Sequence, residues 1–143
     1  METIEVTILG NPAPLARPRF MRSTGIVFDP QKKVKEQVRE QLDRDMVGES
    51  PLLGALHVDL SFHMPIPKSL SKKRQRMWRN SAHSKKPDLD NLIKFSLDVS
   101  NGILFEDDSQ ICSINAFKFY SEEPKTVISI FTYPIEDLSM EKE

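Results

Sequence analysis

Apolar and polar residues alternate along several parts of the chain. From Leu56 to Met64 every second residue is apolar, and a shorter run of the same kind covers Ile4 to Ile8. Successive side chains of a strand point to opposite faces, so this two-residue period is typical of strands with one buried face. The strands predicted in this way are 3–9, 56–64, 111–120 and 126–133, with the last two antiparallel.

A longer period marks the first helix. Apolar residues recur every four positions from Val34 to Met46, which predicts an amphipathic helix over 31–46. Asp29 is expected to be its N-cap, with Pro30 in the first helical position.

Two more helices are expected in the second half of the chain. One is short and basic, covers 72–80, and has Ser69 or Ser71 as its cap. The other begins at Asp88 and ends near 101, where Gly102 suits the left-handed position just past a helix.

The order of these elements predicts the fold class. Strand, helix, strand, short helix, helix, strand, strand is typical of an α+β fold, a mixed β-sheet with helices packed on it. Residues 11–29 carry three prolines and are expected to be a loop or an edge-like extended segment. A chain of 143 residues fits a single domain, which we place at 1–135, followed by an acidic tail at 136–143.

Composition narrows the class of protein. The chain is 38% apolar and 29% charged, which suffices for one core and excludes a disordered tail or a collagen-like chain. Cys112 is the single cysteine, so an internal disulfide is excluded and a reducing cytoplasm is expected. No apolar run reaches the roughly 18 residues that cross a bilayer, and the first residues carry no export signal, so no membrane partner is expected.

The net charge of −1 hides an uneven distribution. Residues 64–94, the basic segment, hold nine basic and two acidic residues, a net charge of +7, and the rest of the chain carries −8. Arg17, Arg19 and Arg22 form a second basic group in a stretch, 8–28, that has no acidic residue. A polyanion responds to the local field rather than to the total charge. Both groups therefore suit a nucleic-acid partner, with a solvated charged face as the plain alternative.

Two carboxylates, Asp88 and Asp90, stand at the end of the basic segment, where a loop meets a helix. Mg²⁺ takes oxygen ligands and is usually held by one or two carboxylates, with water and phosphate completing its shell. Asp107 and Asp108 follow the helix and could fold back beside the first pair. Lys94 lies one helical turn beyond Asp90, where it could reach a phosphate oxygen. This set suits metal-assisted hydrolysis of a phosphodiester.

Each of these residues also has a purely structural explanation. Asp88 is a good N-cap, Asp90 stabilises the helix dipole, and the pair after the helix suits a turn. Lys94 could pair with Asp90 or Asp98 on the surface. Taken singly, these explanations leave open why four acids flank one helix at the end of a basic segment. A basic approach to an acidic pocket is what a metal-dependent nuclease needs.

The same residues resemble a known family. Residues 86–94 read KPDLDNLIK and are followed by Asn101-Gly102 and by DDSQI at 107–111. These motifs and their spacing resemble the RusA family of Holliday junction resolvases, with similarity along 2–133. Residues 64–73 (MPIPKSLSKK) look like the family's basic segment, and 14–32 look like the N-terminal region of its Gram-positive and prophage branch.

The resemblance implies a RusA-like fold and a homodimeric endonuclease that cuts four-way DNA junctions symmetrically with Mg²⁺, for which Mn²⁺ can substitute. Carried over by position, the metal ligands and catalytic carboxylates would be Asp88, Asp90 and Asp108. Lys94 would be the catalytic lysine, and Asn91 and Asp107 would orient the ligands. The expected DNA contacts are Arg17, Arg19, Lys68, Lys72, Lys73, Arg74, Arg76, Lys85 and Lys86.

Two other functions compete with this one. A DNA-structure-binding protein without catalysis would use the acids only to cap and brace the helix. A metal-dependent phosphohydrolase of small phosphate esters would use the acids but has little need of the basic segment. A two-fold dimer would match the two equivalent scissile phosphates of a four-way junction, so a dimer is expected on symmetry grounds as well.

Overall fold

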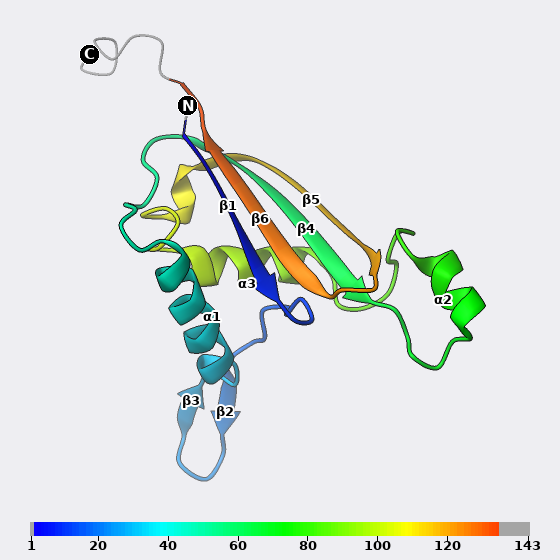
Figure 1. The fold of residues 1–143 in the computed structure, drawn as a ribbon. Coiled ribbons are helices and arrows are strands. Elements are labelled where there is room, and N and C mark those ends of the chain that lie inside the picture. Colours follow the sequence, from blue (N-terminus) through cyan, green and yellow to red (C-terminus); the bar gives the residue numbers. More distant parts are fainter. Residues whose placement is uncertain (1, 135–143) are drawn as a thin grey trace, which may run out of the picture.

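The computed structural model describes residues 2–134, so the predicted acidic tail at 136–143 lies outside the described residues. Figure 1 shows a four-stranded sheet packed by two helices, with a small hairpin and a third helix projecting from this body. This arrangement confirms the predicted single α+β domain with a mixed sheet. The elements are β1 (Thr3–Leu9), β2 (Arg19–Met21), β3 (Ile26–Phe28), α1 (Lys32–Asp45), β4 (Leu56–Pro65), α2 (Lys72–Trp78), α3 (Leu89–Ser100), the 3₁₀ helix η1 (Asp108–Gln110), β5 (Ile111–Ser121) and β6 (Lys125–Thr132).

The core lies between the sheet and helices α1 and α3. The apolar side of β4, from Leu56 to Met64, is 0–3% exposed, as its two-residue period predicted. Leu42 of α1 and Leu92 and Val99 of α3 belong to the same buried cluster. Burial of side chains of this size stabilises a fold by about 1.5–3 kcal/mol each. The core therefore holds the sheet and α3 as one unit.

The strands lie in the order β1-β6-β4-β5. The last two strands run in opposite directions, as predicted, but they are not neighbours. β4 lies between them, parallel to β5 and antiparallel to β6. Alternation indicates which face of a strand is buried and says nothing of which strand it pairs with, so the sequence pattern did not contain this order.

Helix α1 begins one residue later than predicted, and its N-cap is Gln31 instead of Asp29. The Asp29 carboxylate accepts a hydrogen bond from the Gln31 backbone N–H at 2.8 Å, and its other oxygen binds Lys35 at 2.6 Å. Asp29 thus forms a turn just before the helix, a common use of an aspartate there, and this turn displaces the cap by two residues.

The segment 11–29, predicted as a loop or an edge-like extended segment, contains a hairpin. β2 and β3 pair antiparallel around a turn in which Gly25 has a φ of +69°, a value that favours glycine. Strands of three residues are too short to show a two-residue period, which is why the sequence pattern did not reveal them.

Helix α2 is capped by Ser71, whose side chain accepts a hydrogen bond from the Arg74 backbone N–H at 3.2 Å. At its other end Trp78 packs on Tyr120 of β5, with ring centroids 4.9 Å apart. The chain then follows the edge of β5, where the Asn80 N–H donates to the Tyr120 carbonyl at 2.8 Å. The basic helix is therefore anchored on the sheet. Of the helices between residues 2 and 134, none combines the length and the apolar character that crossing a membrane requires.

Candidate active site

Asp88 occupies the N-cap position of α3, but its side chain makes no hydrogen bond to the helix. Its Oδ1 instead accepts a hydrogen bond from Lys86 Nζ at 2.9 Å, and half of the side chain is exposed. This hydrogen bond and the charge of Lys86, helped by the charge of Lys118, hold the pKa of Asp88 below its ordinary value. Asp88 is therefore an ionised, accessible carboxylate that no capping bond occupies.

Asp90 is exposed in the first turn of α3. Its negative charge acts on the ammonium group of Lys86, the group that binds Asp88. The pKa of Lys86 is raised mainly by its hydrogen bond to Asp88 and further by the charge of Asp90. Leu89, between the two acids, packs against the core and so fixes the turn. Asp88 thus binds a cationic group in front of the helix, and Asp90 lies near enough for its charge to act there. Carboxylates are ligands that a divalent cation such as Mg²⁺ prefers.

A lysine that the sequence pattern did not single out holds the loop that carries these acids. Lys118 of β5 is half-buried, and its Nζ donates to the backbone oxygens of Lys85 at 2.5 Å and Pro87 at 2.6 Å. These two carbonyls lie in the loop immediately before Asp88. The sequence did contain a sign of this role. Lys118 lies two residues before the buried Tyr120 and so points to the same, inward face of the strand, which is an uncommon position for a lysine.

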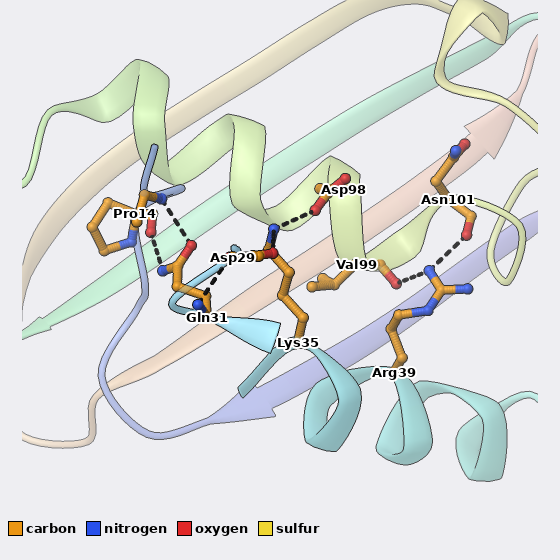
Figure 2. A network of polar contacts seen from close by, with 9 residues as sticks. Pro14, Asp29, Gln31, Lys35, Arg39, Asp98, Val99 and Asn101 are labelled. Carbon is orange, nitrogen blue, oxygen red and sulfur yellow. Dashed lines mark hydrogen bonds and ion pairs between the residues drawn. The ribbon is translucent and has the colours of Figure 1, made fainter. Parts of the chain in front are cut away.

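Lys94 is exposed on α3, one turn beyond Asp90. Asp98, one turn further, binds Lys35 of α1 at 3.2 Å, as Figure 2 shows, and so is not the partner of Lys94. In the part of the chain that the structure describes, Lys94 belongs to no ion pair. Its ammonium group therefore lies on the same helix surface as Asp90 without a competing carboxylate bound to it.

A backbone hydrogen bond attaches the segment that carries the N-terminal basic group to the start of α3. The Leu15 N–H donates to the carbonyl of Asn91, in the first turn of α3, at 2.8 Å. Arg17 follows two residues later, and both Arg17 and Arg19 are exposed. Asn91 thus docks the N-terminal segment beside the acidic pair.

The other basic residues lie on α2 and on the loops around it, and all are exposed. They are Lys68, Lys72, Lys73, Arg74, Arg76, Lys85 and Lys86. Helix α2 projects beyond the end of the sheet, and the loop that follows it leads back to the start of α3 (Figure 1). The structure therefore places these seven residues on one arm, the basic arm, which ends at Asp88.

The second acidic pair begins with a capping residue. The Asp107 side chain accepts a hydrogen bond from the Ser109 backbone N–H at 3.1 Å, and the Asp107 backbone N–H donates to the Gln110 side chain at 3.0 Å. The hydrogen bonds from Ser109 also hold the pKa of Asp107 below its ordinary value. Asp107 thus stabilises η1, which is the turn role that the sequence left open.

Asp108 is exposed, and it does not join Asp88 within one chain. Helix α3 has 12 residues, a length of about 18 Å; Asp88 is its N-cap, and Asp108 begins η1 after its far end. Along the sheet, Lys118 lies seven residues after Ile111, a distance of about 23 Å. Among residues 2–134, no group of three or more His, Cys, Asp or Glu side chains is placed to hold a metal ion. The expected fold-back of the second acidic pair therefore does not occur within a single chain, because α3 separates the pairs.

His83, in the loop before Asp88, packs against Tyr120 with ring centroids 4.8 Å apart. Burial, and then the charge of Lys118, lowers the pKa of His83 below its ordinary value. Its Nδ1 is buried and has no hydrogen-bond partner among residues 2–134. His83 therefore contributes as a neutral ring to the packing of the loop.

Comparisons with known proteins bear on this site. The family described as Endodeoxyribonuclease RusA matches residues 10–131, a range that includes both acidic pairs and Lys94. The uncharacterised protein YqaN of Bacillus subtilis (strain 168) is 33% identical over 137 residues, which cover 91% of this chain and 96% of that protein. The chain therefore belongs to the RusA family of endodeoxyribonucleases.

Proposed function

We propose that this protein is a Mg²⁺-dependent endonuclease that resolves four-way DNA junctions by paired symmetric nicks, with Mn²⁺ able to substitute. The observation that carries the proposal is the pair Asp88 and Asp90, two exposed carboxylates at the start of one helix, of which Asp88 makes no capping hydrogen bond and binds Lys86. Family membership supports the reaction class. The basic arm that leads to the pair supports a polyanionic substrate.

The donor set fits Mg²⁺ in part. Asp88 and Asp90 supply hard oxygen ligands, and Mg²⁺ is often held by two carboxylates together with waters and substrate phosphate. Bound there, the ion would activate water and polarise the scissile phosphate. Lys86 would give up its hydrogen bond to Asp88, which its largely exposed side chain can do without loss of packing.

Lys94 has a separate role in this proposal. An ammonium group one turn from Asp90 can donate to a phosphate oxygen and stabilise charge that develops there during cleavage. The pairing of Asp98 with Lys35 supports this role, because it leaves Lys94 directed at no aspartate along the helix.

A third ligand would come from a second copy of the chain. Carboxylates that share one Mg²⁺ lie within about 4 Å of each other, since each Mg–O bond is about 2.1 Å. Asp108 stands beyond the far end of α3, so we infer that Asp108 of the partner subunit completes each site in a homodimer. A two-fold dimer would then present two equal sites to the two equivalent strands of a junction.

Conservative substitutions at the acidic pair test the proposal. We expect Asp88→Asn and Asp90→Asn to abolish cleavage of a synthetic four-way junction while junction affinity stays the same or rises, because a negative charge is removed near DNA. Asp98→Asn is the matched control on the same helix, and it should cut normally. Full cleavage by Asp90→Asn would overturn the assignment of the ligand.

One observation favours a second candidate function, DNA-structure binding without catalysis. Within one chain, residues 2–134 gather no three-ligand metal group. A protein with this function would bind junctions and leave them intact with either Mg²⁺ or Mn²⁺.

A further inference from the structure

The hairpin formed by β2 and β3 exposes an apolar surface. The two strands form a sheet of their own, and a two-stranded ribbon is only marginally stable in water by itself. Its apolar side chains and their exposed fractions are Phe20 63%, Met21 43%, Ile26 59%, Val27 63% and Phe28 40%. Exposed apolar side chains gathered on one short ribbon indicate an interaction site.

The base of the hairpin is fixed beside the candidate active site. The Gln31 side chain closes the neck, since its Nε2 donates to the Pro14 carbonyl at 2.6 Å and its Oε1 accepts from the Ala16 N–H at 2.8 Å (Figure 2). Between these two contacts, the Leu15 N–H donates to the carbonyl of Asn91, the residue after Asp90. The hairpin thus has a fixed base at the start of α3, two strands with exposed apolar side chains, and a polar turn at 22–25 as its tip.

The charges on the hairpin indicate the chemistry of its partner. Arg17 precedes the hairpin, Arg19 begins β2 and Arg22 lies in the turn, and residues 8–28 contain no acid. An apolar, aromatic ribbon that carries cations fits unstacked bases with their phosphates. A second copy of this chain fits poorly, because a two-fold contact between hairpins would bring the arginines of both copies together.

We propose that the hairpin is a wedge that enters the branch point of a DNA junction and stacks on its unpaired bases. Phe20 and Val27 are register partners and so form one side of the wedge. This inference rests on the proposed function, because DNA must pass Asp90 for the tip to reach a branch point. In a continuous duplex the bases are already stacked and must be separated at a cost, so the wedge favours junctions over duplexes.

A fluorescent base at the branch point tests the wedge. The full chain, without added Mg²⁺, is titrated into a four-way junction that carries 2-aminopurine beside the branch point. We expect fluorescence to rise on binding, because the labelled base loses its neighbouring base, a stronger quencher of 2-aminopurine than the phenylalanine ring that replaces it. The double variant Phe20→Ser/Val27→Ser should give no rise and should bind the junction about 5- to 100-fold more weakly, with duplex affinity unchanged.

Two variants control for fold and for simple loss of apolar surface. Val47→Ser removes the same residue type as Val27 from an exposed position (78%) after α1, and it should behave as the parent protein does. Phe20→Trp keeps an aromatic ring and should keep the junction affinity of the parent protein.

Three results would overturn the inference. If the double variant gives the parent's fluorescence rise and junction affinity while the parent cuts junctions, the wedge is absent and the proposed function stands. If the double variant sediments as a smaller species than the parent, the hairpin is a contact between copies. If the parent neither binds nor cuts junctions, the wedge and the proposed function fail together.

Discussion

Mixing two inactive variants should restore cleavage if each acidic site is completed across a dimer. The basis is the position of Asp108 beyond the far end of α3, a helix about 18 Å long that begins directly after Asp88, so the two do not share an ion within one chain. In a heterodimer of Asp90→Asn and Asp108→Asn, one site carries both substitutions and the other site carries neither. The second site should cut.

The expected yield follows from counting sites. Random assortment of equal amounts gives about one half heterodimers, each with one intact site of two, so about one quarter of the sites should be active. Co-expression with two different affinity tags ensures that the two variants assemble together. The assay is cleavage of a junction labelled on each strand, and the product should be single nicks instead of paired ones.

A matched mixture provides the control. Asp88→Asn with Asp90→Asn should stay inactive, because both residues lie on the same side of the site and every site then carries one substitution. No activity from the Asp90→Asn and Asp108→Asn mixture, with heterodimers isolated through both tags, would refute the composite site. Equal activity of both mixtures would also refute it.

Three further predictions follow from single features. Lys118→Met should raise the Mg²⁺ concentration for half-maximal cleavage about tenfold, because hydrogen bonds from a charged group, worth about 1.5–3 kcal/mol, hold the loop before Asp88. Lys125 is also half-buried, and Lys125→Met should leave this concentration unchanged. Equal concentrations for the two variants would contradict the role of Lys118 in holding the loop. Burial lowers the pKa of His83 and His63 below the ordinary 6.5. As the pH falls, these histidines therefore bind protons in the unfolded chain before they do so in the folded one, and the free energy of unfolding decreases below about pH 6.5. His83→Leu should therefore flatten the plot of Tm against pH between about 7 and 5, and an unchanged slope would count against it. The affinity for duplex DNA should fall steeply as the salt concentration rises. Replacing basic residues of α2 by neutral ones should reduce the slope of log affinity against log salt concentration by about 0.9 for each DNA phosphate that the protein no longer neutralises. A flat salt response would exclude this arm as the surface that binds DNA.

Elements that carry their own pattern could be predicted from the sequence. The alternation from Leu56 to Met64 predicted β4 and its buried face, and Gly102, with a φ of +81°, marks the end of α3 as expected. The neighbour of each strand could not be predicted, because pairing depends on contacts between residues far apart in the chain. The three-residue strands of the hairpin carry too few residues for a period to appear.

The candidate site was predictable as a set of residues and less so as a geometry. Asp88 and Asp90 are separated in sequence by Leu89 alone, so placing them together needed only one helix start. The distance to Asp108 depends on the length and direction of α3. The hold of Lys118 on the loop depends on β5 lying beside it, which periodicity does not reveal. Local spacing therefore identified the acidic pair but not the residues that position it.

The most direct test of the central claim is cleavage of a four-way junction labelled separately on its four strands, with and without Mg²⁺. We expect nicks at symmetric positions on two opposing strands, formed only with the metal and absent for Asp90→Asn although that variant still binds. A junction that the parent protein binds but leaves intact, with Mg²⁺ and with Mn²⁺ alike, would contradict the claim.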